Sequence, residues 1–284
     1  MYKKLRPMDL FLRGLIWLSA GVTILMTVGI LAYILVRGVP SISWSFLTTA
    51  PSELTGTIGI LPNIINTLYI VLITLLISTP IGIGAAIYLT EYGGKSKFVK
   101  IIEFTTETLA GIPSIIYGLF GFMFFVVFMG LQYSILAGGL TLSIMVLPTI
   151  IRTTQEALKS VNPLYREAAL GIGATRVHMI RTVLLPSAMP GIITAIILSI
   201  GRIVGESAAL IFTAGIGVKM LKLTPAGVFE HLETSGATLT VQLYQYAMRG
   251  EDLGVSFAIA AVLVIIVLLI NFATKRLARR FRCG

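Results

Sequence analysis

Long apolar runs occupy most of this chain, and they restrict its fold more than any other feature of the sequence. About 20 consecutive apolar residues are needed for an α-helix to cross the hydrocarbon core of a bilayer. The runs that come close to that length are 14–36, 65–89, 112–130, 133–151, 190–213 and 254–272. The sequence therefore predicts an all-α, polytopic membrane protein with about six transmembrane helices.

Composition agrees with that class. Of the 284 residues, 56% are hydrophobic and only 12% are charged, which is far from the composition of a water-soluble domain. The net charge of +10 does not indicate nucleic acid as a partner, because the basic residues stand in short blocks beside the apolar runs. Cys283 is the single cysteine, so the sequence predicts neither an internal disulfide nor a CxxC metal site, and no cofactor.

The first run is too long for the core of a signal peptide, and 37–40 is a poor cleavage site, so we expect a permanent helix. The predicted organisation is an N-terminal segment, a first span, an outer loop, a permease domain with a coupling segment at 152–189, and a basic tail. These parts are 1–13, 14–36, 37–64, 65–272 and 273–284.

Lysine and arginine in short loops set the orientation of membrane helices, because they accumulate on the cytoplasmic side. Most basic residues of this chain fall on one side of the predicted topology, and only Arg37, Lys219, Lys222 and Arg249 fall on the other. We expect a multi-pass protein of the cytoplasmic membrane with both termini and the coupling segment inside. The loops 38–64 and 214–253 would face outward.

The coupling segment has clear local signals. Asn162 and Pro163 form an N-cap and first-turn pair, which predicts a helix start. Gly171 and Gly173 interrupt that helix, and Thr175 can cap a second helix that we expect to run until Pro186.

Two interpretations of this segment remain open. Ala168 and Ala169 leave a surface of low relief that another protein's backbone could approach, with charge from Arg166 and Glu167 at its border. Alternatively, the segment is an amphipathic connector that lies on the bilayer. A DNA-binding helix-turn-helix is disfavoured, since both ends are tethered to spans.

The spacing of this segment resembles the coupling motif of permease subunits in bacterial type I ATP-binding-cassette importers. The matching residues are Glu167, Ala168, Ala169, Gly173, Leu185 and Pro186, and Val183 stands where the family usually has Ile. The resemblance implies the type I ABC importer permease fold, with this helix seated in a groove of a nucleotide-binding subunit.

Three further stretches, 109–121, 147–158 and 201–210, are similar to phosphate-transport permeases of the PstA type. The resemblance implies import of inorganic phosphate across the cytoplasmic membrane. It also implies three kinds of partner: a related PstC-like permease subunit, a dimer of ATP-binding subunits, and an extracytoplasmic phosphate-binding protein. The stretch 93–96 resembles a phosphate loop, but Leu89 replaces the required first glycine, so we expect a transport subunit rather than an enzyme.

Arg202 carries the strongest chemical signal, because an arginine deep in a span costs roughly 2.5 to 3.5 kcal/mol even on a lenient scale. Ser199, Arg202, Glu206 and Thr213 recur at helical spacing, which predicts one polar stripe along the fifth span as the wall of a translocation pathway. Gly201 and Gly205 form a small-xxx-small pair, which predicts close packing of a neighbouring helix.

Arg202 and Glu206 allow two interpretations. They could form an ion pair that fixes helix packing. Alternatively, Arg202 binds a tetrahedral oxyanion during passage while Glu206 holds the guanidinium between passages, with a second positive group supplied elsewhere. Sulfate, molybdate or tungstate would suit the same chemistry as alternative substrates. A homodimer is an alternative to pairing with a related subunit. An ion-coupled secondary transporter and a membrane enzyme are alternative classes of protein.

His178 and His231 are expected to be surface residues.

Overall fold

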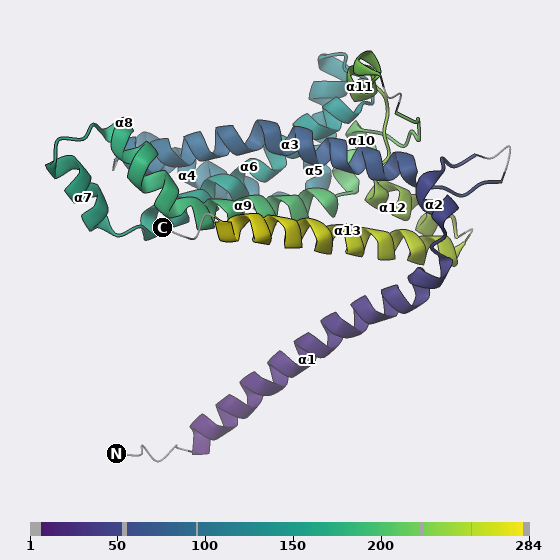
Figure 1. Cartoon of the computed structure of the whole chain (residues 1–284), viewed down its shortest axis with the longest axis horizontal. Helices are drawn as coiled ribbons and strands as arrows, with labels where there is room; N and C mark the ends of the chain where they lie inside the picture. The colour runs from purple at the N-terminus through teal and green to yellow at the C-terminus, as the bar shows by residue number, and fades with distance from the viewer. Residues whose placement is uncertain (1–6, 53–55, 95, 222–223, 251, 281–284) are drawn as a thin grey trace.

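The computed structural model describes residues 7–52, 56–94, 96–221, 224–250 and 252–280. Helices make up most of these residues, and the described ranges contain no β-strand beyond two isolated bridges. The long helices are α1 (Pro7–Gly38), α3 (Leu61–Ile87), α6 (Ile135–Ser160), α9 (Leu185–Val204) and α13 (Leu253–Arg280). Figure 1 shows the last four of these side by side in one bundle.

Short helices connect the long ones. On the first half of the chain they are η1 (Val39–Ser41), α2 (Trp44–Thr48), η2 (Tyr88–Tyr92), α4 (Lys97–Ala110), α5 (Ser114–Gly121) and η3 (Phe122–Phe128). On the second half they are α7 (Pro163–Gly171), α8 (Arg176–Met179), η4 (Ile180–Leu184), α10 (Ala208–Thr213), α11 (Pro225–Leu232) and α12 (Leu239–Arg249). In the described residues, 5 helices are long and apolar enough to cross a membrane, or up to 6 if one bent pair counts as a span. The predicted all-α polytopic class is confirmed.

The bent pair has two arms. One is α4, the other is α5 with its π-helical continuation η3, and the angle between the two arms is 102°. The run 112–130, which the sequence predicts as one ordinary span, is thus the second arm of a bent element. Pro113 explains the corner, because proline disfavours helical geometry at the residue before it. Across the corner, the hydroxyl of Tyr117 donates to the carbonyl oxygen of Leu109 at 2.8 Å.

Helix α1 leaves the bundle at an angle and meets α13 near its own C-terminal end (Figure 1). There Tyr33 packs edge-on against Phe257, and a Cβ at Gly38 would overlap the carbonyl oxygen of Phe257. No residue in the most apolar window of α1 is buried within this chain. Because so long an apolar surface is unfavourable in water, we expect lipid or another protein to cover it.

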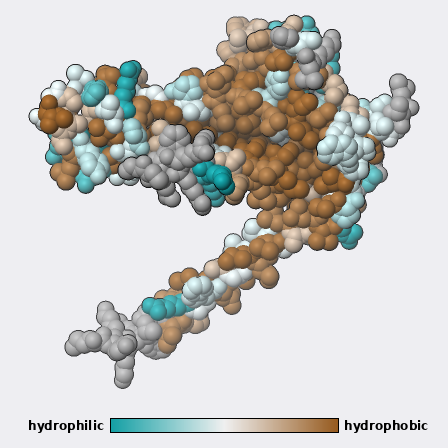
Figure 2. Space-filling view, in the orientation of Figure 1, coloured by the Kyte–Doolittle hydropathy of each residue, from teal (hydrophilic) through white to brown (hydrophobic). Residues whose placement is uncertain are grey.

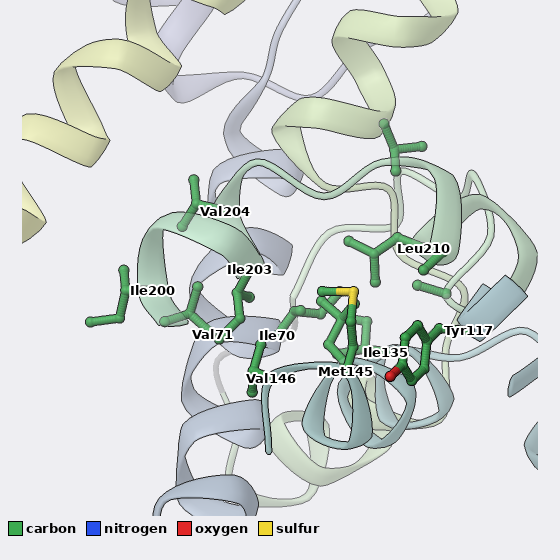
Figure 3. Close-up of a cluster of buried hydrophobic side chains, with 14 of the residues drawn as sticks. Ile70, Val71, Tyr117, Ile135, Met145, Val146, Ile200, Ile203, Val204 and Leu210 are labelled. Atoms are coloured by element: carbon green, nitrogen blue, oxygen red, sulfur yellow. The ribbon is translucent and has the colours of Figure 1, made fainter. Parts of the chain in front are cut away.

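The core lies where α3, α6 and α9 pack together, with α5 and α10 closing one side (Figure 3). Its fully buried large side chains include Ile70, Ile135, Leu142, Met145, Ile150, Ile203 and Leu210. Helices α3 and α6 approach closely at two glycines: a Cβ at Gly82 would lie 2.6 Å from Ile150, and one at Gly139 would lie 2.7 Å from Ile73. Larger residues at these two positions would force the helices apart.

The two ends of the bundle are polar. Figure 2 shows apolar surface over the middle of the bundle and more polar surface at both ends. We call the end formed by α7 and α8 the α7 end, and the opposite end, with α2 and α12, the α12 end (Figure 1). This division is that of a protein whose middle lies in lipid.

Candidate functional site

The fifth span breaks in the region that the sequence singles out. Helix α9 ends at Val204, residues 205–207 are not helical, and α10 starts at Ala208. The carboxylate of Glu206 accepts a hydrogen bond from the backbone N–H of Ala209 at 3.1 Å, so it satisfies a free donor at the start of α10. The hydroxyl of Thr240 donates to the carbonyl oxygen of Glu206 at 2.8 Å and holds the break against α12. The prediction of one continuous polar stripe is therefore wrong.

Arg202 lies in the last turn of α9 rather than deep in an unbroken helix. A cation is favoured there by the partial negative charge of the helix C-terminus, which offsets part of its cost in lipid. Its side chain is half-buried, and Nη1 reaches the hydroxyl of Thr149 on α6 at 3.5 Å. The structure therefore adds Thr149 to the site, a contact that the sequence could not indicate because 53 residues separate the two.

Arg202 makes no ion pair with Glu206, so that interpretation of the pair is wrong for this structure. Among the described residues, the ion pairs involve other arginines and lysines, and none neutralises Arg202. The break in the helix explains this, because Glu206 is no longer one helical turn from Arg202 and its carboxylate caps α10 instead. An unneutralised guanidinium is available to an anion.

Ser199 and Thr213 are fully buried. Each hydroxyl donates within its own helix, to the carbonyl oxygen of Ala195 at 2.9 Å and of Ala209 at 2.8 Å. Thr213 also lies close to Gly121 of α5: a Cβ added at Gly121 would be 2.9 Å from the methyl carbon of Thr213. Thr213 therefore contributes to the packing of α10 on α5. In this chain the two hydroxyls line no open surface, and their part in translocation stays a prediction.

Gly201 and Gly205 are exposed, and the predicted close packing of a helix on them is not found within this chain. A Cβ at Gly201 would meet nothing within 4 Å, and one at Gly205 would approach only the carbonyl oxygens of residues 201 and 202. Within the described ranges, no three side chains of His, Cys, Asp or Glu gather where they could hold a metal ion.

The coupling segment starts as its sequence predicts. Asn162 accepts a hydrogen bond from the N–H of Leu164 at 3.0 Å, and Thr175 accepts one from the N–H of His178 at 3.3 Å, which confirms both caps. Between the two helices, Gly173 has φ +87°, a conformation that favours glycine. The expected end at Pro186 is wrong, because α8 continues through the π-helical turn η4 into α9.

The two alanines of the motif have different environments. Ala169 is buried against a cluster that includes Met179 and Leu184, and it holds α7 on η4. Ala168 and Glu167 are exposed at the α7 end. Glu167 and Ala168 therefore belong to the exposed surface of α7, together with Leu164, Tyr165 and Leu170, while Ala169 sets the distance between α7 and the rest of the chain.

Two expectations about charged and titratable side chains are wrong. Arg166 does not stand at the border of an exposed surface, because its side chain points inward to Glu91 with a relative exposure of 20%.

His231 is buried at 4% exposure, and its Nε2 donates to the side-chain oxygen of Asn66 at 2.8 Å. Burial, with a smaller contribution from the charge of Lys219, lowers the pKa of His231. His178 is exposed, as expected.

Fold and site together define a polytopic, all-helical membrane permease, with a helix–glycine–helix element at one polar end and a broken span beside a free arginine. Residues 78–282 match the family described as binding-protein-dependent transport system inner membrane component. Since the match covers well over half of the sequence, the chain belongs to this family.

Curated relatives agree with that assignment. The chain is 36% identical over 279 residues to the probable ABC transporter permease protein YqgI of Bacillus subtilis, and the match covers 94% of each protein. It is 32% identical over 264 residues to the phosphate transport system permease protein PstA of Haemophilus influenzae, covering 92% of this chain and 90% of the relative.

Solved structures show the same fold. The methionine ABC transporter MetNI in its inward-facing conformations gives a TM-score of 0.61 at 25% identity, over 78% of this chain and 94% of that chain. A bacterial ABC transporter involved in the import of alginate gives 0.67 at 19% identity, over 96% of both chains, and supports the fold alone. The expected type I ABC importer permease fold is confirmed.

Proposed function

We propose that the chain is the permease subunit of an importer that carries inorganic phosphate across the cytoplasmic membrane, driven by ATP hydrolysis in a separate subunit. The observation that carries the proposal is the half-buried, unneutralised Arg202 at the break in the fifth span. Support for phosphate as the substrate comes from relatives that are named as phosphate transport permeases.

Arg202 would act as a transient contact for the anion. Its planar guanidinium can donate two parallel hydrogen bonds to a tetrahedral oxyanion, and the hydroxyl of Thr149 lies beside it as a further donor. One guanidinium leaves a doubly charged phosphate partly unneutralised, so a second positive group is needed. Glu206 supports the site by capping α10 and so fixing the break.

A second positive group would come from a related, PstC-like permease subunit that pairs with this one. The exposed glycines 201 and 205 lie beside Arg202 and leave room for a helix of that subunit to approach. Such an arrangement would set the two permease chains on either side of the passing anion.

The orientation follows from the coupling segment. In the proposed complex, the α7 end faces the cytoplasm and its exposed Glu167 and Ala168 contact the dimer of ATP-binding subunits. Helix α13 runs toward the α7 end and α1 begins on that side, which supports cytoplasmic termini (Figure 1). The α12 end would receive an extracytoplasmic phosphate-binding protein. Nucleotide binding and hydrolysis would belong to the partner subunits.

The test is uptake of radiolabelled phosphate by the complete transporter in proteoliposomes, with ATP or ADP inside and with excess sulfate, molybdate or tungstate outside. We expect uptake that requires ATP and resists these competitors. Uptake without ATP would indicate a secondary transporter, and a wild-type complex that moves one of the competitors but no phosphate would reject the substrate.

A further inference from the structure

Arg166 connects α7 to the preceding end of α6 and to a segment 75 residues earlier in the chain. Its Nε lies 3.1 Å from the carboxylate of Glu91 in η2, directly after α3. Its Nη1 and Nη2 donate to the carbonyl oxygens of Val161 at 3.2 Å and Leu158 at 2.6 Å, at the end of α6. Helix α7, which carries Arg166, is thereby bonded to the ends of both α3 and α6.

This ion pair differs from the others in the described residues by its burial. The side chains of Arg166 and Glu91 are 20% and 10% exposed, whereas those of the remaining pairs are between 42% and 67% exposed. Exposed pairs contribute little, because water and salt screen them. A shielded pair with two further charge-assisted hydrogen bonds is stiffer, and the loss of either partner leaves a buried charge.

The two carbonyl groups add to that stiffness. The last carbonyls of a helix lack the N–H partner four residues ahead. That of Leu158 accepts the N–H of Val161 at 3.4 Å and can accept a second, outside donor. Arg166 provides it from α7, and its positive charge also suits the negative end of α6. A lysine would place a charge nearby, but it lacks the planar fork that serves Glu91 and two carbonyl oxygens together.

The position of Arg166 within the coupling segment gives the contact its significance. The neighbouring Glu167 and Ala168 belong to the exposed surface of α7, and the C-terminal end of α7 leads through α8 and η4 into α9. A force on α7 therefore reaches α9 along the chain. It also reaches α6 along the chain, through Val161 and Asn162, and it reaches α3 through the bond of Arg166 to Glu91.

We propose that Arg166 and Glu91 form a latch that makes α3 move together with α7 and the adjoining end of α6, so that ATP hydrolysis in the partner subunits stays coupled to transport. Arg166 is a positioning residue, since it contacts neither substrate nor nucleotide. The inference rests on the proposed function, because it assumes that an ATP-hydrolysing partner acts on α7. When the latch is broken, α7 moves with its partner while α3 stays in place.

The first experiment measures ATP hydrolysis and phosphate uptake on the same reconstituted complex, each normalised to the amount of assembled transporter. In Arg166→Gln we expect hydrolysis to persist while uptake per ATP falls several-fold to about tenfold. Glu91→Gln keeps an oxygen that can accept from Arg166 and should lose less, and Arg166→Lys should lie between wild type and Arg166→Gln. Lys159→Gln is the matched control: it breaks an exposed pair with Glu103 at 3.7 Å and should leave the ratio unchanged.

The latch would be overturned by an uptake-to-hydrolysis ratio that stays at the wild-type value in Arg166→Gln. If the ratio is unchanged but less complex assembles, the contact is needed for folding alone.

A covalent rescue separates a mechanical link from an effect of charge. In a Cys283→Ser background, Glu91→Cys and Arg166→Cys are combined and joined by a short bismaleimide. Cross-linked complexes should regain most of the uptake per ATP that the uncross-linked double variant loses. Failure of a verified cross-link to restore the ratio would contradict the latch.

A third measurement keeps the latch testable if phosphate is not the substrate. In the same background, Ser207→Cys places a thiol in the break of the fifth span, and a water-soluble maleimide reports its accessibility with ATP or ADP bound to the complex. A wild-type labelling rate that responds to ATP in a complex without phosphate uptake rejects the substrate alone. Arg166→Gln should abolish that response, and a response as large as that of wild type would overturn the latch.

Discussion

The carboxylate of Glu206 accepts a hydrogen bond from the backbone of Ala209, while Arg202, four residues earlier in the chain, reaches Thr149 instead of Glu206. In an unbroken helix the two charged side chains would be neighbours and would neutralise each other. The break at 205–207 separates their roles, so that Glu206 stabilises the start of α10 and Arg202 keeps a free guanidinium. The following predictions test these assignments.

Replacement of Arg202 should impair transport in a graded way. Arg202→Ala should abolish phosphate uptake, and Arg202→Lys should reduce it by about tenfold, because lysine keeps the charge but not the planar fork. Uptake kinetics of the reconstituted complex measure both. Arg13→Ala, an exposed arginine on α1, serves as the control and should transport normally. Unchanged uptake in Arg202→Ala would remove this residue from the pathway.

Replacement of Glu206 distinguishes a helix cap from an ion-pair partner. Gln keeps an oxygen that can accept from the N–H of Ala209, so Glu206→Gln should retain nearly all the thermal stability. Glu206→Ala removes the acceptor and should lower the free energy of unfolding by about 0.5 to 2 kcal/mol, as the loss of a cap does. Thermal unfolding of the purified complex in detergent tests the difference. Equal losses in the two variants would indicate that the charge, and not the cap, matters.

A methyl group at Gly139 should destabilise the bundle. The added Cβ would lie 2.7 Å from Ile73, so Gly139→Ala should cost about 1 to 3 kcal/mol by overpacking. The second substitution Ile73→Ala should recover part of that loss, since it removes the clashing atoms. Gly201→Ala is the matched control, because nothing lies within 4 Å of its added Cβ. Thermal unfolding compares wild type, the single variants Gly139→Ala, Ile73→Ala and Gly201→Ala, and the double variant. Additive losses in the double variant would refute the close approach of α3 and α6.

Acid should destabilise the protein through His231. Its pKa in the folded state lies below the ordinary value of 6.5, so the unfolded chain binds the proton more readily. Neutral His231 makes its full contribution to the free energy of unfolding above about pH 6.5. That contribution is lost as the pH falls from there through the pKa of the folded state. Melting temperatures measured from about pH 7.5 to pH 5 should fall.

The His231→Gln variant should lose part of that pH dependence, because Gln keeps polar atoms near Asn66 without titrating. His178→Gln, at an exposed position, should keep the full dependence. Identical pH profiles for wild type and His231→Gln would show that another group is responsible.

Local features of this protein could be predicted from the sequence with good accuracy. The caps at Asn162 and Thr175 and the glycine turn between them depend on neighbouring residues, so the pattern of residue types was sufficient to find them. The bend at Pro113 could not be predicted in the same way. A proline favours the start of a helix, but the 102° angle depends on how α4 and α5 pack on the bundle.

The errors at the candidate site share one cause. Arg202, Glu206 and Thr213 have helical spacing, and spacing alone predicted one stripe on one helix. The hydrogen bond from Thr240 to the carbonyl of Glu206 spans 34 residues, and no local pattern reveals such a contact. Arg166 likewise looked like surface charge, because its partner Glu91 is 75 residues away.

The sequence by itself determined that this chain is a helical membrane permease, because the length and apolarity of its runs leave a bilayer as their only suitable surroundings, and because the coupling motif lies within one short segment. Only the tertiary structure decided which polar side chains are free and which are committed. Arg202 is free, Glu206 caps a helix, and His231 is buried against Asn66, 165 residues away. Such roles depend on which distant groups compete for each hydrogen bond, and the packing of α3, α6 and α9 settles that competition.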